Sequence, residues 1–198
     1  MPPSRAAWPG RGKDSMINRK LIAGATALAV VAGGGSAAMA AKKPPKTATI
    51  KAVETDSFKI NRYLQLGIRW KRDNYTVKSG GTLRLVNLSP GAGPHTFSVV
   101  KRKDLPRTKK QMNSCKVCAK LGQAHGADPN GQAPPKFAYL ENGKGQNTPP
   151  NVDRPGDSAL LGPKRGDVTK LKVTAKRGKT LNFLCIIHPW MQAKVHVR

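Results

Sequence analysis

The sequence is short of acidic side chains, of aromatic side chains and of histidine. It has 10 aspartates and glutamates against 36 lysines and arginines, 5% aromatic residues and four histidines. Asp153, Asp157 and Asp167 are scattered through loop-like sequence and suggest no carboxylate pair for acid–base work. No nucleophile stands in a recognisable arrangement with a base. These absences argue against an enzyme of the acid–base or covalent type.

The excess of positive charge, formally +26 at pH 7, describes the surface. Nucleic acid is a common partner of a basic chain, but the basic residues here are spread singly and in pairs. There is no long basic run and no recognised nucleic-acid motif, so we expect no nucleic acid. The charge instead predicts a partner protein with an acidic surface, anionic cell-envelope polymers or lipid headgroups as counterparts.

Long apolar runs are also missing. The run from Leu21 to Ala32 is shorter than the ~20 residues that a membrane span needs. It follows a short basic start and precedes Ala38-Met39-Ala40, which matches the cleavage pattern of an export signal. We expect residues 1–40 to be an N-terminal extension and signal peptide, with Met16 as a candidate start. An uncleaved membrane anchor is the alternative. Residues 41–198 are then exported to the periplasm, the cell surface or the medium.

Cysteine is scarce, and the number of cysteines is odd. Cys115 and Cys118 can close as a disulfide in an oxidising compartment, which leaves Cys185 unpaired. Metal ligation would occupy that thiol and protect it. No histidine follows the C-x-x-C pair, which excludes attachment of a c-type haem. A metal site built from this pair and His125 offers only three donors of the four that structural zinc takes.

Short strand patterns, in contrast, are plentiful. In the segment that starts at His95, the side chains of Phe97 and Val99 share the face of His95, and Thr96 and Ser98 share the other face. Six to eight such strands predict an all-β fold, a β-sandwich. The candidate strands are Thr49–Val53, Tyr75–Lys78, Leu83–Leu88, the segment from His95, the segments around Leu171 and Leu181, and the C-terminal segment with Val195 and Val197.

A stretch of different composition, about residues 101–167, separates the two β regions. Its first part, Arg107 to Ala124, predicts a short helix. The remainder has loop composition, with Pro134-Pro135 and Asn142-Gly143 among its turn signals. Too few large apolar residues are present for a separate core. We therefore expect an insertion that lies over the sandwich of a single domain, residues 41–198.

Four metal-binding side chains stand out near the strand ends: His95, Cys185, His188 and Met191. Each alone has a structural explanation as a buried histidine, a core thiol or packing. However, the C-x-x-H-x-x-M spacing places three donors on one tight loop. Two imidazoles, a thiolate and a thioether are the ligands of a blue-copper site. Zinc also accepts Cys and His, but the thioether favours copper.

These motifs carry a resemblance to a known family. Gly93-Pro94-His95-Thr96-Phe97 and the run from Cys185 to Met191 resemble those of the cupredoxins, the type 1 copper proteins that include plastocyanin, pseudoazurin and amicyanin. The loop is most similar to that of amicyanin. The resemblance implies a Greek-key β-sandwich that binds one copper ion through the four residues named above. It also implies that His188, with Pro189 and Trp190, is the electron port, although Trp190 is equally compatible with core packing.

Two residues depart from the family pattern. Thr96 stands where many cupredoxins have an asparagine that braces the ligand loop. Leu184 stands where plastocyanins have an aromatic residue on a second electron path, so we expect no such path here.

The function predicted from the sequence is a one-electron carrier that is not an enzyme. Copper storage, sensing or delivery is the alternative, but delivery proteins use several Met or His ligands, and only Met112 and Met191 follow residue 40. A nitrite reductase or multicopper oxidase would need further histidine pairs, which four histidines do not supply.

Overall fold

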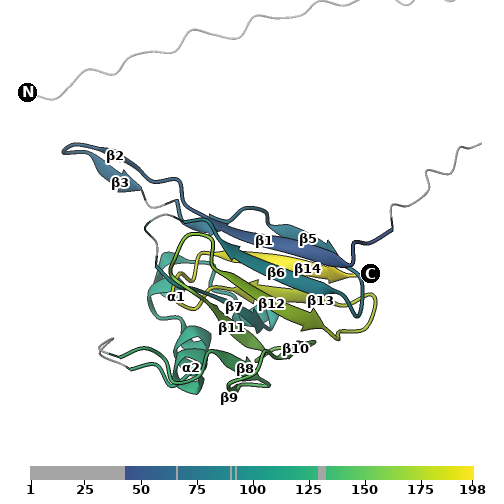
Figure 1. The fold of residues 1–198 in the computed structure, drawn as a ribbon. Coiled ribbons are helices and arrows are strands. Elements are labelled where there is room, and N and C mark those ends of the chain that lie inside the picture. Colours follow the sequence, from purple (N-terminus) through teal and green to yellow (C-terminus); the bar gives the residue numbers. More distant parts are fainter. Residues whose placement is uncertain (1–42, 66, 90, 92, 129–132) are drawn as a thin grey trace, which may run out of the picture. The chain divides into compact units, whose positions relative to one another are not determined.

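The computed structural model describes residues 43–198 except 66, 90, 92 and 129–132 (Figure 1). The predicted signal segment, within residues 1–40, lies outside the described residues. No helix in the described part of the chain is long and apolar enough to cross a bilayer.

Two β-sheets form the body of the described chain (Figure 1). The predicted all-β sandwich is confirmed. The five-stranded sheet contains, in spatial order, β10 (Asn151–Val152), β12 (Val168–Val173), β6 (Thr82–Asn87), β1 (Thr47–Val53) and β4 (Arg69–Trp70). The seven-stranded sheet contains, in spatial order, β5 (Asn74–Val77), β14 (Gln192–Val197), β13 (Thr180–Leu184), β7 (His95–Val100), β11 (Ser158–Leu161), β8 (Tyr139–Glu141) and β9 (Lys144–Gln146).

The main core lies between these sheets, because the alternating strands turn their apolar side chains inward. In β12 every second residue is buried, and in β14 the buried residues alternate with half-buried ones. Phe183 stands at the centre of an aromatic group, with its ring centroid 4.5 Å from that of Phe97 and 5.5 Å from that of Trp70. The two-sheet sandwich is thus closed by residues far apart in the sequence.

The insertion differs from the expected loop, because it contributes strands to the sandwich. β11 pairs with β7, and β8 and β9 extend the sheet beyond it. The prediction of loop is wrong for these strands. Asn142 and Gly143, with φ of 53° and 77°, form the two-residue turn of the β8–β9 hairpin, for which left-handed residues are required.

The helical part of the insertion covers the outer face of the seven-stranded sheet. The predicted helix divides into α1 (Lys109–Asn113) and α2 (Lys116–Ala124) after a 3-10 turn, η1 (Arg102–Asp104). Thr108 caps α1 with a capping box, and Cys115 caps α2. A second apolar cluster forms beneath them from Val100, Cys118, Leu121, Leu140 and Leu184. As a result all six residues of β7 are buried.

A small hairpin, β2 (Ser57–Lys59) with β3 (Tyr63–Gln65), projects from the sandwich (Figure 1). Its apolar side chains are exposed, with 73% of Phe58 and 69% of Leu64 accessible.

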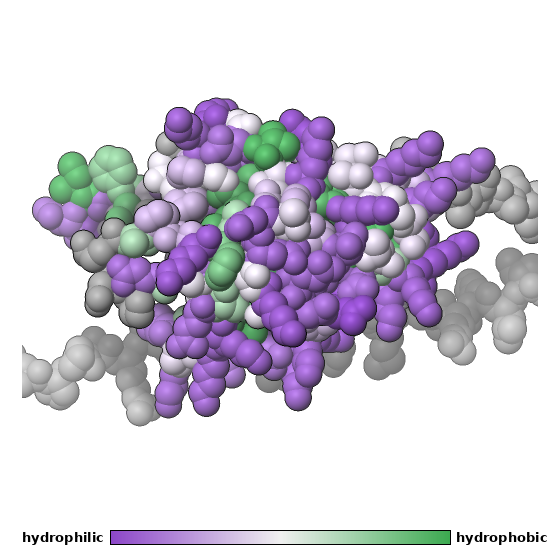
Figure 2. Space-filling model, turned by 60° about the horizontal axis from the view of Figure 1, so that its bottom comes forward, coloured by the Kyte–Doolittle hydropathy of each residue, from purple (hydrophilic) through white to green (hydrophobic). Residues whose placement is uncertain are grey.

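Most of the face in Figure 2 is hydrophilic, in agreement with the basic composition.

Candidate metal centre

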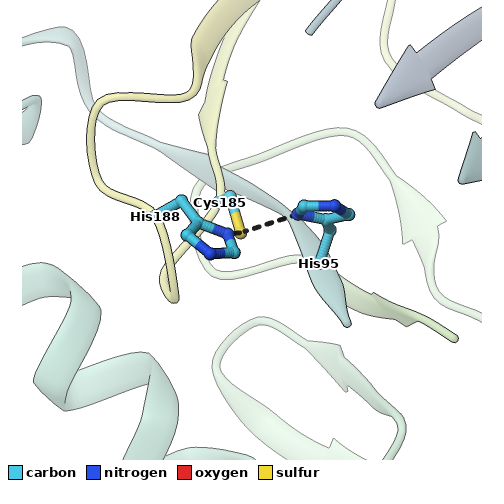
Figure 3. Close-up of side chains that lie close together, drawn as sticks. All are labelled: His95, Cys185 and His188. Carbon is cyan, nitrogen blue, oxygen red and sulfur yellow. Dashed lines mark hydrogen bonds between the residues drawn. The ribbon is translucent and has the colours of Figure 1, made fainter. Parts of the chain in front are cut away.

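The first histidine and the cysteine meet because two neighbouring strands run in opposite directions. His95 begins β7, Cys185 directly follows β13, and the two strands pair antiparallel with Leu184 opposite Ser98. This register puts the end of β13 beside the start of β7. His188 is brought in by the turn that follows Cys185 (Figure 3).

The three side chains converge on one point. Nδ1 of His188 lies 3.7 Å from the sulfur of Cys185, and Nδ1 of His95 lies 4.0 Å from it. The donor atoms of the three residues all lie within 4.8 Å of one another. A metal about 2.0 Å from nitrogen and about 2.3 Å from sulfur, with trigonal angles, separates these atoms by about 3.7 Å. The spacing therefore fits a single ion in the plane of the three donors.

Met191 is held in the same turn by its backbone. Its carbonyl accepts a hydrogen bond from the N–H of Cys185 at 3.0 Å and another from Trp70 Nε1 at 3.1 Å. Its own N–H donates to the carbonyl of His188 at 2.8 Å. The side chain is only 1% exposed. The turn thus closes on itself and keeps the thioether in the core.

Burial decides the protonation of the site. It lowers the pKa of His95 to about 4, with a smaller contribution from the charge of His188. It also lowers the pKa of His188. Both imidazoles are therefore neutral at pH 7, the form in which histidine binds metals.

The cysteine is shifted in the opposite sense. Burial raises the pKa of Cys185, opposed by hydrogen bonds from the backbones of Thr96, His188 and Ile187 and from the side chain of Thr96. The thiol holds its proton until an ion takes its place. The same hydrogen bonds are ready to stabilise the thiolate.

Two polar residues brace the site. The N–H of Ile186 donates to Thr96 Oγ1 at 2.8 Å, and the N–H of Thr96 points at the Cys185 sulfur at 3.3 Å. Asn87 is fully buried, and its Nδ2 donates to the carbonyls of Gly93 and Gly162. Thr96 thus makes by its hydroxyl a loop contact for which the resemblance suggested an asparagine. The sequence did not single out Asn87, because it does not show which backbone carbonyls the side chain contacts.

Only one edge of the site approaches the surface. His95 and Cys185 are fully buried, whereas His188 is half-buried and Trp190 is 45% exposed. The imidazole of His188 lies edge-on to the indole of Trp190, with centroids 5.4 Å apart. The indole N–H donates to the carbonyl of Ile68 at 2.9 Å. Trp190 is therefore a surface side chain anchored at one end, not a core residue.

The remaining candidates are separate from this centre. Cys115 and Cys118 form a disulfide with a Cα separation of 5.2 Å. His125, 1% exposed, uses both ring nitrogens within the protein, Nδ1 with the carbonyl of Phe137 and Nε2 with Ser158 Oγ. The donors of the suggested second metal site are thus engaged elsewhere.

No family model and no curated protein matches the chain in sequence. Among solved structures, auracyanin from Roseiflexus castenholzii is similar at 18% identity, covering 79% of this chain and 99% of its own, with a TM-score of 0.42. A purple cupredoxin from Nitrosopumilus maritimus is 15% identical over 76% of this chain and 98% of its own, with a TM-score of 0.37. Amicyanin from Paracoccus versutus is 13% identical over 80% and 87%, with a TM-score of 0.33.

At identities this low, the metal and the reaction have to be inferred from the residues of this chain itself. In its two-sheet sandwich and in the order of His95, Cys185, His188 and Met191, the chain resembles the cupredoxins.

Proposed function

We propose that this protein is a type 1 copper protein that carries single electrons. His95 and His188 would hold the ion through Nδ1, Cys185 through its thiolate, and Met191 through a weak axial thioether. The observation that carries the proposal is the trigonal spacing of three donors, 3.7 Å and 4.0 Å from sulfur to nitrogen. Copper bound there would supply a Cu(I)/Cu(II) couple whose potential the axial ligand tunes.

Copper is favoured over zinc by the donor set. The cluster contains no carboxylate, and the fourth candidate ligand is the thioether of Met191. A thioether suits copper, whereas a structural zinc site takes Cys, His or carboxylate in all four positions.

Electron transfer is favoured over catalysis by the burial of the donors. His95, Cys185 and Met191 are at most 1% exposed, so no open position faces solvent for a substrate. Catalytic metal sites keep such a position. A closed site with neutral imidazoles changes oxidation state with little rearrangement.

The electron would pass through His188. Its imidazole is the half-buried ligand, and Pro189 and the exposed indole of Trp190 surround it. The formal charge of +26 suits docking on an acidic redox protein, or attachment to an anionic cell envelope, and either would weaken as salt rises. The disulfide and the signal-like segment support an extracytoplasmic location.

Storage or delivery of copper is the competing function. It is disfavoured because the described residues contain one such donor cluster and it is enclosed, whereas delivery requires exposed ligands that can exchange copper. Exchange of bound copper with an external chelator on a timescale of seconds would reverse this preference.

The visible spectrum tests the proposal. Purified protein loaded with Cu(II) should show an intense thiolate-to-copper band that disappears on reduction. Cys185→Ser should abolish the band, while the matched double variant Cys115→Ser with Cys118→Ser should keep it. A colourless copper-loaded protein would refute the type 1 assignment.

A further inference from the structure

A buried row of hydroxyl groups connects the metal centre to the insertion. Ser98 Oγ donates to Thr96 Oγ1 at 3.0 Å, and Ser98 Oγ and Ser158 Oγ are 2.7 Å apart. Ser158 Oγ lies 2.8 Å from Nε2 of His125, the residue that ends α2. All four side chains are at most 1% exposed. The side chain of Thr96 also hydrogen-bonds to Cys185. The row therefore runs from Cys185 to an imidazole without contact with water.

At the His125 end of the row, the position of one proton is fixed. Nδ1 of His125 lies 2.8 Å from the carbonyl of Phe137. A carbonyl only accepts, so Nδ1 carries a proton in either charge state. The second nitrogen, Nε2, is then an acceptor in the neutral ring and a donor in the charged ring. The charge of His125 consequently dictates what Ser158 must do.

Counting protons gives two arrangements. Each hydroxyl has one proton to donate. When His125 is charged, it donates to Ser158, Ser158 to Ser98, and Ser98 to Thr96, which leaves the Thr96 proton for the sulfur of Cys185. When His125 is neutral, keeping every contact requires all three hydroxyl protons to turn toward it.

We propose that His125 is a positioning residue for the metal centre: the proton on its Nε2 sets the direction of the Ser158–Ser98–Thr96 row, and so decides whether Thr96 donates to the Cys185 sulfur. The inference rests on the proposed function in taking that sulfur as the metal ligand. The insertion is then the element that regulates the centre.

The sign of the effect follows from charge. A hydrogen bond to the thiolate withdraws negative charge from it, and a cation in the same buried region favours the reduced ion of lower charge. Both raise the reduction potential. The potential should therefore rise as the pH falls through the pKa of His125, and by linkage reduction should raise that pKa.

The surroundings of His125 make it a titrating group with a simple environment. Burial lowers its pKa, and the carbonyl of Phe137 opposes this to a smaller extent, with no charged group among the causes. It is thus neutral at pH 7, and its protonation requires a pH below the ordinary range of imidazole. The ionisable side chains on the elements packed around it are Lys120 on α2, Asp128 and Lys136 between α2 and β8, Glu141 on β8, Asp157 beside Ser158, and His95 on β7.

The decisive experiment uses the full-length, metal-free protein, so that it does not depend on copper. NMR titration should show the Ile186 amide proton, which donates to Thr96, shifting with the same midpoint as the His125 ring. In Ser158→Ala the ring should still titrate while the Ile186 shift stays flat. If Ile186 still follows the ring in Ser158→Ala, or never follows it, the hydroxyl row is not the connection.

The copper-loaded protein supplies the second readout. Between high and low pH the Cu(II)/Cu(I) ratio at fixed applied potential should fall about tenfold, equivalent to about 59 mV for one electron. The step should vanish in His125→Gln, shrink in Ser158→Ala, where only the through-space effect of the His125 charge remains, and persist in His196→Gln, which removes a histidine bonded to Thr180 and Asn74. Should His125→Gln not fold, Ser158→Ala, which removes one oxygen, decides alone. A step of undiminished size in Ser158→Ala overturns the inference, whereas a colourless protein with intact coupling refutes only the copper assignment.

Discussion

The ligand loop and the insertion reach the same metal centre by opposite routes. The loop from Cys185 to Met191 supplies three metal ligands from seven consecutive residues, and its backbone–backbone hydrogen bonds close within the turn. The insertion supplies no proposed metal ligand. It covers the outer face of β7 and β13 and meets the centre through buried hydroxyl groups. Three of the four proposed metal ligands are thus local in the sequence, whereas His95 and the environment of the site are brought in over long distances.

The insertion can be separated from the loop by weakening its core. Leu140 on β8 is fully buried in the second cluster, so Leu140→Ala should cost about 2–5 kcal/mol of unfolding free energy. Urea unfolding followed by far-UV circular dichroism measures it. Leu64→Ala, at a site 69% exposed, should change stability by less than about 0.5 kcal/mol. A separate early transition in Leu140→Ala would mean that the insertion unfolds independently of the sandwich.

The disulfide tests how far the insertion depends on its own constraint. Cys115 and Cys118 close a very short loop, with a sequence separation of 3, so removing the bond by the double serine variant should cost about 2 kcal/mol. The copper spectrum should not move, because neither sulfur contacts the centre. Thermal melting measured with and without reductant gives the effect. A changed spectrum would indicate that α2 positions the ligand loop as well as covering it.

The sequence correctly predicted those features of the fold that depend on a single strand or a single turn. Alternation identified β12 and β14 because each has one buried face, and the donor spacing identified the turn. The strands of the insertion escaped, since β8 and β9 have three residues each and β11 is buried on both faces. Segments of this kind carry no alternating pattern.

The polar face of β7 held a signal that alternation alone does not interpret. Thr96 and Ser98 were assigned to the face opposite His95, yet the insertion buries both. On β12 the corresponding outward residues are Lys170 and Lys172, which are exposed. Small hydroxyl side chains on an outward face, in place of lysine, indicate a face that another element covers. Ser158, the partner of Ser98, lies 60 residues away in the sequence, so this contact depends on tertiary structure.

Thr96 belongs to both regions, and its replacement sharpens the comparison. Thr96→Val removes the acceptor of the Ile186 N–H, and because Ile186 is half-buried water can partly replace it. We expect a cost of about 1 kcal/mol with a shifted charge-transfer band, while Thr96→Ser should restore both. Equilibrium unfolding and visible absorption measure the pair. An unchanged band in Thr96→Val would mean that backbone N–H groups alone define the sulfur environment.

The smallest effect is expected at the exposed edge of the ligand loop. Trp190→Phe keeps an apolar ring beside His188 but removes the hydrogen bond to the carbonyl of Ile68. Because this hydrogen bond is only partly buried, solvent can partly replace it, so the loss in unfolding free energy should stay below about 1 kcal/mol. The absorption band should be retained, since the turn is closed by the backbone bonds of Met191. A loss as large as that expected for Leu140→Ala would instead mean that Trp190 is part of the structural core. The stability of the ligand loop would then depend on its contacts with β4 and the five-stranded sheet.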